Sequence, residues 1–76
     1  MAKRADLSDL KRYWTQPFVT RKDIARFSSG LMSPQYLANL DIMDKGPAGR
    51  FKVGNKIAYP VSSVIEWLES RSEVIE

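Results

Sequence analysis

Residues 46–60 read "GPAGRFKVGNKIAYP" and set the architecture that the rest of the chain has to satisfy. Two short runs that suit β-strands, 50–53 and 57–59, flank a turn of glycine, asparagine and lysine, which is typical of a β-hairpin. An isolated two-stranded hairpin is only marginally stable in water, so this one must pack against neighbouring segments. Because the sequence on both sides has helical patterns, we predict a basic hairpin held between helices.

The length of the hairpin loop determines which side chains share a face. A two-residue loop would pair Val53 with Lys56 and mix apolar and charged residues on each face. A three-residue loop pairs Val53 with Ile57 and gathers the four apolar side chains of the hairpin on one face. We therefore predict the three-residue loop, whose tip suits Gly54 and Asn55 because both tolerate a positive φ.

The composition limits the class of protein. The chain has 76 residues, enough for one domain with a thin core, and is 43% hydrophobic and 28% charged. No apolar run approaches the roughly 18 residues of a membrane span, and the basic N-terminus lacks the apolar segment of a signal peptide. Histidine and cysteine are absent, which removes the commonest general base and the usual zinc ligands. We expect a cytoplasmic protein that is not an enzyme, has no metal or cofactor and does not bind a membrane.

The charge is distributed unevenly along the chain. Residues 1–60 carry eleven Lys/Arg against five Asp/Glu, which is +6, whereas residues 61–76 carry one against four, which is −3. A basic body with an acidic end suits an anionic partner on one face. The alternative is that the charge serves solubility alone.

The first and last helices are predicted on either side of this basic body. The first covers 6–15, with Asp6 as its N-cap and Pro17 as its stop. The last covers 63–70, with Ser62 as its N-cap. Each helix contributes one tryptophan to the predicted core: Trp14 and Trp67.

Two further short helices are predicted between them, joined by a tight turn that contains Gly30. Thr20 caps the first of the pair. Ser33 caps the second, which covers 33–43 and has Pro34 in its first turn, where the missing N–H costs nothing. Such a pair is typical of a helix-turn-helix, although the pattern is also common by chance.

Helix, turn, helix, basic hairpin and helix is the order of a winged helix-turn-helix. The segment 18–71 resembles the excisionase and AlpA-like family of small regulators, within the MerR-like winged-helix group. The resemblance rests on five features in this order: Ile24-Ala25 in a capped helix, the Ser33-Pro34 start, the Gly46-Pro47 step, the "KVGNKIAY" hairpin and the "VIEWLES" helix. We therefore expect one mainly α domain over 1–76 with one β-hairpin, an additional N-terminal helical segment at 6–16 and a tail at 72–76.

The resemblance implies that the helix 33–43 enters the major groove of DNA and that the hairpin 50–59 touches the backbone or minor groove. Members of the family act in prophages and other mobile elements, as transcription regulators or as proteins that direct recombinases. We accordingly expect double-stranded DNA as the partner. Because one such helix reads only a few base pairs, a second copy, a recombinase or a polymerase is a further expected partner. The acidic last helix, with Val74 and Ile75 beyond it, is a candidate surface for such assembly.

The alternative is a protein–protein adaptor on the same scaffold, for instance in phage morphogenesis or DNA packaging, since a fold does not fix a function.

The site residues follow from the two faces of the helix 33–43. The inward face is predicted to hold Tyr36, Leu37, Leu40 and Met43, and the opposite face Gln35, Ala38, Asn39 and Ile42. Asparagine and glutamine can bond both N6 and N7 of adenine, and an apolar side chain can meet a thymine methyl. The predicted base contacts are Gln35, Ala38 and Asn39, although Gln35 and Asn39 would also fit an ordinary solvated surface.

The predicted contacts to the DNA backbone come from three places. They are the start of the first helix of the pair, the N-terminus of the second, whose N–H groups can hold a phosphate, and the hairpin. The residues are Arg21, Lys22, Ser33, Tyr36, Arg50, Lys52, Asn55 and Lys56. Near the C-terminal end of the second helix, Asp41 and Asp44 would repel a phosphate, so we expect only its first two turns to approach DNA.

Overall fold

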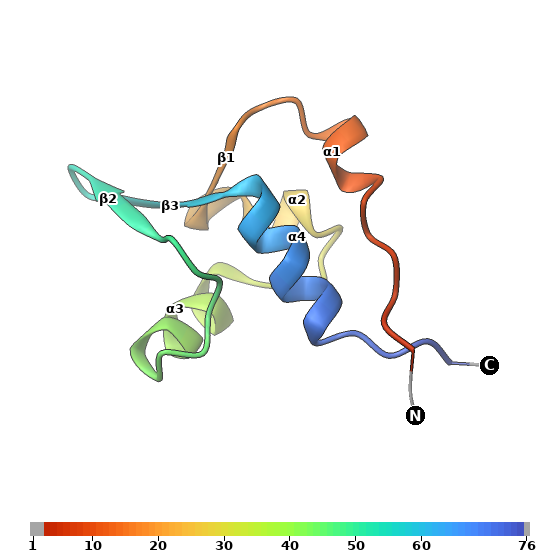
Figure 1. Cartoon of the computed structure of the whole chain (residues 1–76). Helices are drawn as coiled ribbons and strands as arrows, with labels where there is room; N and C mark the ends of the chain where they lie inside the picture. The colour runs from red at the N-terminus through yellow and green to blue at the C-terminus, as the bar shows by residue number, and fades with distance from the viewer. Residues whose placement is uncertain (1–2, 76) are drawn as a thin grey trace.

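The computed structural model describes residues 3–75, so residues 1, 2 and 76 of the predicted domain and tail lie outside the described range. The elements are α1 (Leu10–Tyr13), β1 (Phe18–Thr20), the 3₁₀-helix η1 (Arg21–Asp23), α2 (Ile24–Phe27), α3 (Pro34–Ile42), β2 (Phe51–Val53), β3 (Lys56–Pro60) and α4 (Val61–Ser70). The described residues form four α-helices and one three-stranded antiparallel sheet, and the β2–β3 hairpin projects from the rest of the molecule (Figure 1). Between residues 3 and 75, none of the helices has the length and apolar character needed to cross a membrane.

The sheet has one strand more than the predicted hairpin. The strand order is β1-β3-β2, and β1 pairs with β3 through Val19 opposite Tyr59 and Thr20 opposite Ala58. The prediction of a mainly α fold with a single hairpin is therefore corrected to a mixed α/β fold. The aromatic and β-branched residues of β1 suit a strand, but only the distant β3 gives them a partner.

The hairpin register also differs from the prediction. Val53 pairs with Lys56, so the loop has two residues and the prediction of three is wrong. Gly54 has φ +61°, which fits the first central position of a type II′ turn. The prediction assumed that only one face of the hairpin buries apolar groups. On the face away from the core, however, Phe18 packs edge-on against Phe51 with ring centroids 4.9 Å apart, so both faces hold apolar side chains.

The hydrophobic core lies between the sheet and the helices. Its buried residues are Val19, Ile24, Phe27, Leu37, Tyr59, Val61, Val64, Ile65 and Leu68. The prediction that both tryptophans belong to the core is confirmed, since Trp14 and Trp67 are partly buried and pack against this cluster. Trp67 also donates from its indole nitrogen to the carbonyl of Lys45 at 2.9 Å, which ties α4 to the loop after α3.

The caps of η1, which leads into α2, and of α3 are the ones that the sequence predicts. The hydroxyl of Thr20 accepts from the backbone N–H of Asp23 at 3.3 Å, and that of Ser33 accepts from Tyr36 N–H at 3.1 Å. Gly30 has φ +84° in the turn between the helices, which an L side chain rarely adopts. The start of α3 is therefore fixed by its local sequence.

The two outer helices depart from the prediction. The first is shorter than the predicted 6–15, and Asp6 does not cap it but accepts from Ser8 N–H at 3.0 Å. The chain before α1 follows the end of α4 instead, where Leu7 N–H donates to the Glu69 carboxylate at 2.8 Å. This long-range anchor removes the residues that would have formed the first helical turn.

The start of α4 lies earlier than the predicted 63–70, and Ser62 is not its N-cap. Because β3 runs directly into the helix, its last residue, Pro60, takes the N-cap position, and proline has no polar side chain to cap the helix. The N–H of Val61 donates to the carbonyl of Pro17 at 3.1 Å, so a backbone group from the turn before β1 satisfies the first helical donor.

Candidate nucleic-acid interface

One face of α3 is an exposed polar row. Gln35 and Asn39 are exposed and Ala38 is half-buried, whereas Leu37 and Leu40 are buried on the opposite face. The side-chain amide of Gln35 donates to Asn39 Oδ1 at 3.3 Å, so the two residues form one continuous hydrogen-bonding surface. The prediction that this face points away from the protein is confirmed. Whether it contacts bases stays a prediction.

The inward face of α3 differs from the prediction at three positions. Tyr36 and Met43 are 45% and 54% exposed, so their assignment to the inward face is wrong. Asp41 takes an inward position instead and is only 6% exposed. A carboxylate is tolerated there because Arg21 of η1 and Tyr59 of β3 supply partners for it.

These three residues form a buried polar hub. Arg21 Nη2 donates to Asp41 Oδ2 at 2.5 Å, the hydroxyl of Tyr59 donates to the same oxygen, and Arg21 Nε donates to the Tyr59 oxygen at 3.1 Å. Burial, and then the hydrogen bond with Asp41, raise the pKa of Tyr59 to about 12, so its hydroxyl keeps the proton that it donates. The hub joins η1, α3 and β3. The hub also pairs the charge of Asp41 with that of Arg21, although the sequence predicted that Asp41 would repel a phosphate.

The second oxygen of Asp41 faces the base of the hairpin. Asp41 Oδ1 is buried without a hydrogen-bond partner, and Arg50 Nη1 lies 3.8 Å from it. The same nitrogen lies 3.8 Å from Asp44 Oδ1, so Arg50 is placed between two carboxylates. Gly46 packs directly on the Asp41 carboxylate, where a β-carbon would overlap Oδ1.

The close approach of Gly46 gives a stability prediction. Gly46→Ala is expected to lower the free energy of unfolding by about 1–3 kcal/mol, because the added methyl group displaces the Asp41 carboxylate from Arg21. Thermal or urea unfolding of the variant measures the loss. Ala48→Ser, at an exposed position of the same loop, is the matched control. Equal stability of the two variants would contradict the packing described here.

A groove of about 620 Å³ separates the hairpin tip from η1 and the start of α3. Four of the predicted backbone contacts line it, together with Pro34 at the start of α3: Arg21, Lys22, Asn55 and Lys56. Lys52 shares the face of its cross-strand partner Ile57, which also lines the groove. Segments that are more than thirty positions apart in the sequence are thus brought to one concave surface.

Arg21 and the predicted backbone contacts outside the groove, apart from Lys52, are engaged within the protein. The Ser33 hydroxyl caps α3, and the Tyr36 hydroxyl accepts from Arg71 Nη2 at 3.2 Å at the end of α4. The side chain of Arg21 is 24% exposed and belongs to the hub, and Arg50 lies beside Asp41 and Asp44. The groove set is therefore Lys22, Asn55 and Lys56, and Lys52 lies on β2 next to it.

Sequence reasoning missed the hub, although one signal pointed to it. Leu37, Leu40 and Asp41 are spaced i, i+3 and i+4, so a carboxylate stands on the apolar stripe of the helix. A charged residue at such a position requires a buried partner. Comparison of the chain with protein-family models, with curated proteins and with solved structures finds no match, so the interface is interpreted from its own geometry.

Proposed function

We propose that this chain is a DNA-binding protein of the winged helix-turn-helix class, in which α3 is the recognition helix and the β2–β3 hairpin is the wing. The single observation that carries the proposal is the convergence of Lys22, Asn55 and Lys56 around one groove beside α3. Pro34 lines that groove and directly precedes Gln35, where the exposed Gln35–Asn39 row begins. Cations that hold a backbone and amides that read base edges are the two kinds of contact that sequence-specific binding needs.

The exposed row of α3 has the length and the chemistry to contact a few base pairs. Gln35, Ala38, Asn39 and Ile42 follow one another at i, i+3, i+4 and i+7 along the exposed face of α3. Ile42 is 84% exposed, which is unusual for a large aliphatic side chain and fits contact with a thymine methyl. The major groove, about 12 Å wide, admits a single α-helix in this way.

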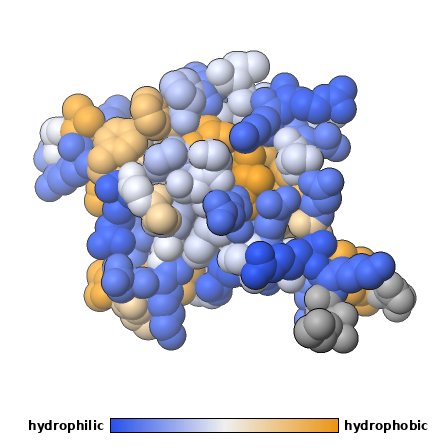
Figure 2. Space-filling model, viewed as in Figure 1, coloured by the Kyte–Doolittle hydropathy of each residue, from blue (hydrophilic) through white to orange (hydrophobic). Residues whose placement is uncertain are grey.

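The charges near the groove favour an anionic partner. Among the described residues, the carboxylates close to the groove each have a cationic neighbour: Asp23 has Arg26 at 3.3 Å, and Asp41 has Arg21 at 2.5 Å. The same part of the chain gives Lys22, Lys52 and Lys56 no ion pair. The excess positive charge is thus carried by three exposed lysines. In Figure 2, blue hydrophilic atoms accompany the orange ones over the projecting hairpin at the left.

By its resemblance to excisionase and AlpA-like regulators, we propose that this binding serves transcription regulation or the direction of a recombinase in a phage or another mobile element. The segment of that resemblance, 18–71, includes all of the groove residues. Binding to random duplex DNA at low salt, measured by gel shift, tests the proposal. Absence of any shift would refute it.

The wing lysines give a quantitative expectation. Lys52→Ala and Lys56→Ala should each weaken binding to all duplex sequences alike and reduce the slope of log K against log salt concentration by about 0.9. The physical reason is that each lysine which neutralises a phosphate releases a counterion. Fluorescence anisotropy over a salt series measures the slope. Lys11→Ala, on α1 away from the hairpin, is the control and should leave the slope unchanged.

A protein–protein adaptor is the second candidate, and one observation favours it. Three large apolar side chains on or beside α3 are exposed, namely Leu31 at 70%, Ile42 at 84% and Met43 at 54%. Such side chains suit a protein partner as well as thymine methyls. The gel shift separates the two functions, because an adaptor gives no salt-dependent binding and no response to the lysine substitutions.

A further inference from the structure

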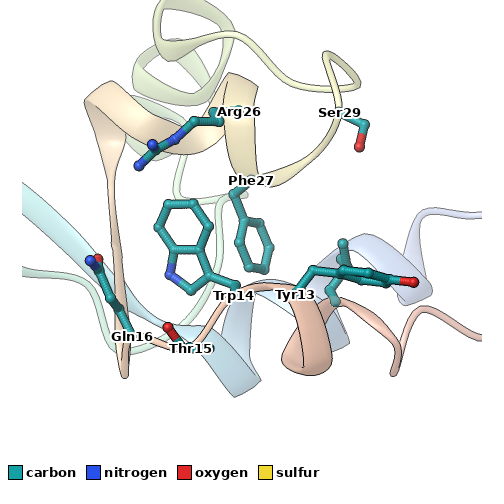
Figure 3. A pocket seen from close by; sticks show the side chains of 8 residues that line it. Tyr13, Trp14, Thr15, Gln16, Arg26, Phe27 and Ser29 are labelled. Carbon is teal, nitrogen blue, oxygen red and sulfur yellow. The ribbon is translucent and has the colours of Figure 1, made fainter.

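A second hollow lies between α1 and α2, away from the wing. It has a volume of about 440 Å³, and its floor is formed by Trp14 and Phe27, whose rings meet edge-on with centroids 5.2 Å apart (Figure 3). The guanidinium of Arg26 lies over the Trp14 ring, 5.0 Å from its centroid. Phe27 lies between Trp14 and Tyr13 in the same view. The hollow therefore combines an aromatic floor with a cation at its rim.

These features select an aliphatic side chain with a carboxylate close to it. An aromatic floor buries an aliphatic group well, and Arg26 is 70% exposed, so it keeps donors for a second carboxylate besides Asp23. The surrounding sequence is basic, since residues 1–16 carry four Lys/Arg against two Asp, which is +2. An acidic, aliphatic segment is the complementary partner.

The chain carries such a segment at Glu73-Val74-Ile75. Ile75 is 93% exposed, whereas Val74 is 42% exposed and its N–H donates to the carbonyl of Lys3 at 2.8 Å. Side chains two residues apart project to the same side of an extended segment. Glu73 and Ile75 are both exposed, so the tail offers a carboxylate and an aliphatic group two residues apart.

The tail of one molecule does not reach its own hollow. Ala5 N–H donates to Ser72 Oγ at 2.7 Å, and with the bond between Val74 and Lys3 this fixes the tail beside the N-terminal segment. In Figure 1 this junction lies at the lower right, and α1 lies at the upper right. A tail that enters this hollow therefore belongs to a second copy.

We propose that two copies of this chain pair about a two-fold axis, with Ile75 of each copy seated on the Trp14–Phe27 floor of the other and Glu73 facing Arg26. In Figure 1, α1, which lines the hollow, and the C-terminal tail both lie on the side of the molecule away from the wing, so the pairing leaves α3 and the groove open on both copies. Reciprocal exchange closes the assembly as a dimer, the commonest symmetry of protein oligomers. The pairing does not depend on the proposed function, to which it would add a second recognition helix.

Sedimentation equilibrium over a concentration series tests the pairing. The wild-type chain should show a monomer–dimer equilibrium, and Ile75→Ser should weaken dimerisation by roughly 100-fold, because both copies lose a buried isoleucine. Val53→Ser removes another exposed aliphatic side chain, 69% exposed on the wing, and should have no effect. A wild-type chain that stays monomeric up to millimolar concentration overturns the proposal, and so does a dimer that is insensitive to Ile75→Ser.

A charge exchange tests the contact itself. Arg26→Glu alone and Glu73→Arg alone should each be monomeric, because like charges then meet in both contacts. An equimolar mixture of the two variants should recover the dimer, since every contact in the mixed dimer again joins opposite charges. Assemblies larger than a dimer would overturn the reciprocal arrangement. Circular dichroism checks that Arg26→Glu folds, and Glu73→Arg, at an exposed position, gives the same test if it does not.

A DNA measurement separates this proposal from the proposed function. Ile75→Ser should bind a duplex with a single half-site as tightly as the wild-type chain does. A dimer without DNA binding would refute the proposed function alone, whereas DNA binding by a strict monomer would refute the pairing alone.

Discussion

Asp41→Ala is expected to lower the free energy of unfolding by about 2–4 kcal/mol. The substitution removes the carboxylate to which Arg21 and Tyr59 both donate, and it leaves their polar groups beside the core without a partner. The expected loss lies toward the low end of what breaking a buried ion pair costs. The reason is that the Arg21 side chain is 24% exposed, so its guanidinium regains some hydration in the variant. Urea unfolding monitored by tryptophan fluorescence measures the change.

Asp44→Asn is the matched control, since Asp44 follows the same helix, its side chain is 95% exposed and asparagine tolerates its φ of +60°. It should change the stability by no more than about 0.5 kcal/mol. Equal stabilities of the two variants would show that the hub contributes nothing net. Tyr59→Phe is a second test of the hub's contribution to stability, because it removes one hydrogen-bond donor and leaves the Arg21–Asp41 ion pair in place.

Asn39→Ala should abolish the preference for one base pair while leaving affinity for random DNA nearly unchanged. A bidentate amide–adenine contact discriminates by about 1–3 kcal/mol, which is about 5- to 150-fold in affinity. The wild-type chain should separate the preferred and substituted sequences by that factor, whereas the variant should bind them about equally. The Gln35–Asn39 hydrogen bond positions the amide before DNA arrives, which lowers the entropic cost of the contact. Selection from a randomised duplex library followed by competition binding measures the preference.

Asn55→Ala is the comparison for this experiment. Asn55 carries the same amide group but lies at the hairpin tip, where the proposed contact is with the backbone. Its loss should weaken all sequences alike. A result in which Asn39→Ala behaves in that uniform way would contradict base reading by α3.

Local signals explain what the sequence predicted correctly. Ser33 and Pro34 set the start of α3, Thr20 sets the start of η1 and Gly30 sets the turn between them, and each acts through neighbours within a few residues. The exposed row of α3 follows from the same helical period. The exposed row of the candidate interface could therefore be outlined before any tertiary contact was known.

Non-local contacts explain the rest. Val19 pairs with Tyr59, forty positions later in the chain, and nothing in the local pattern of either segment names that partner. This pairing adds the third strand. Packing of Phe18 on Phe51 stabilises the register with a two-residue loop, whereas the local pattern predicted a three-residue loop. The inward turn of Asp41 likewise depends on Arg21 and Tyr59, each at least eighteen positions away.

The central place of β3 in the sheet has a consequence for how the chain acquires its structure during synthesis. Tyr59 and the four core residues of α4 are the last part of the core to leave the ribosome. Until they emerge, β1 has no partner strand and Ile24 and Leu37 have little apolar surface to pack on. The α2–α3 pair should accordingly fold stably only after α4 has been translated, so that the whole domain folds in one late step.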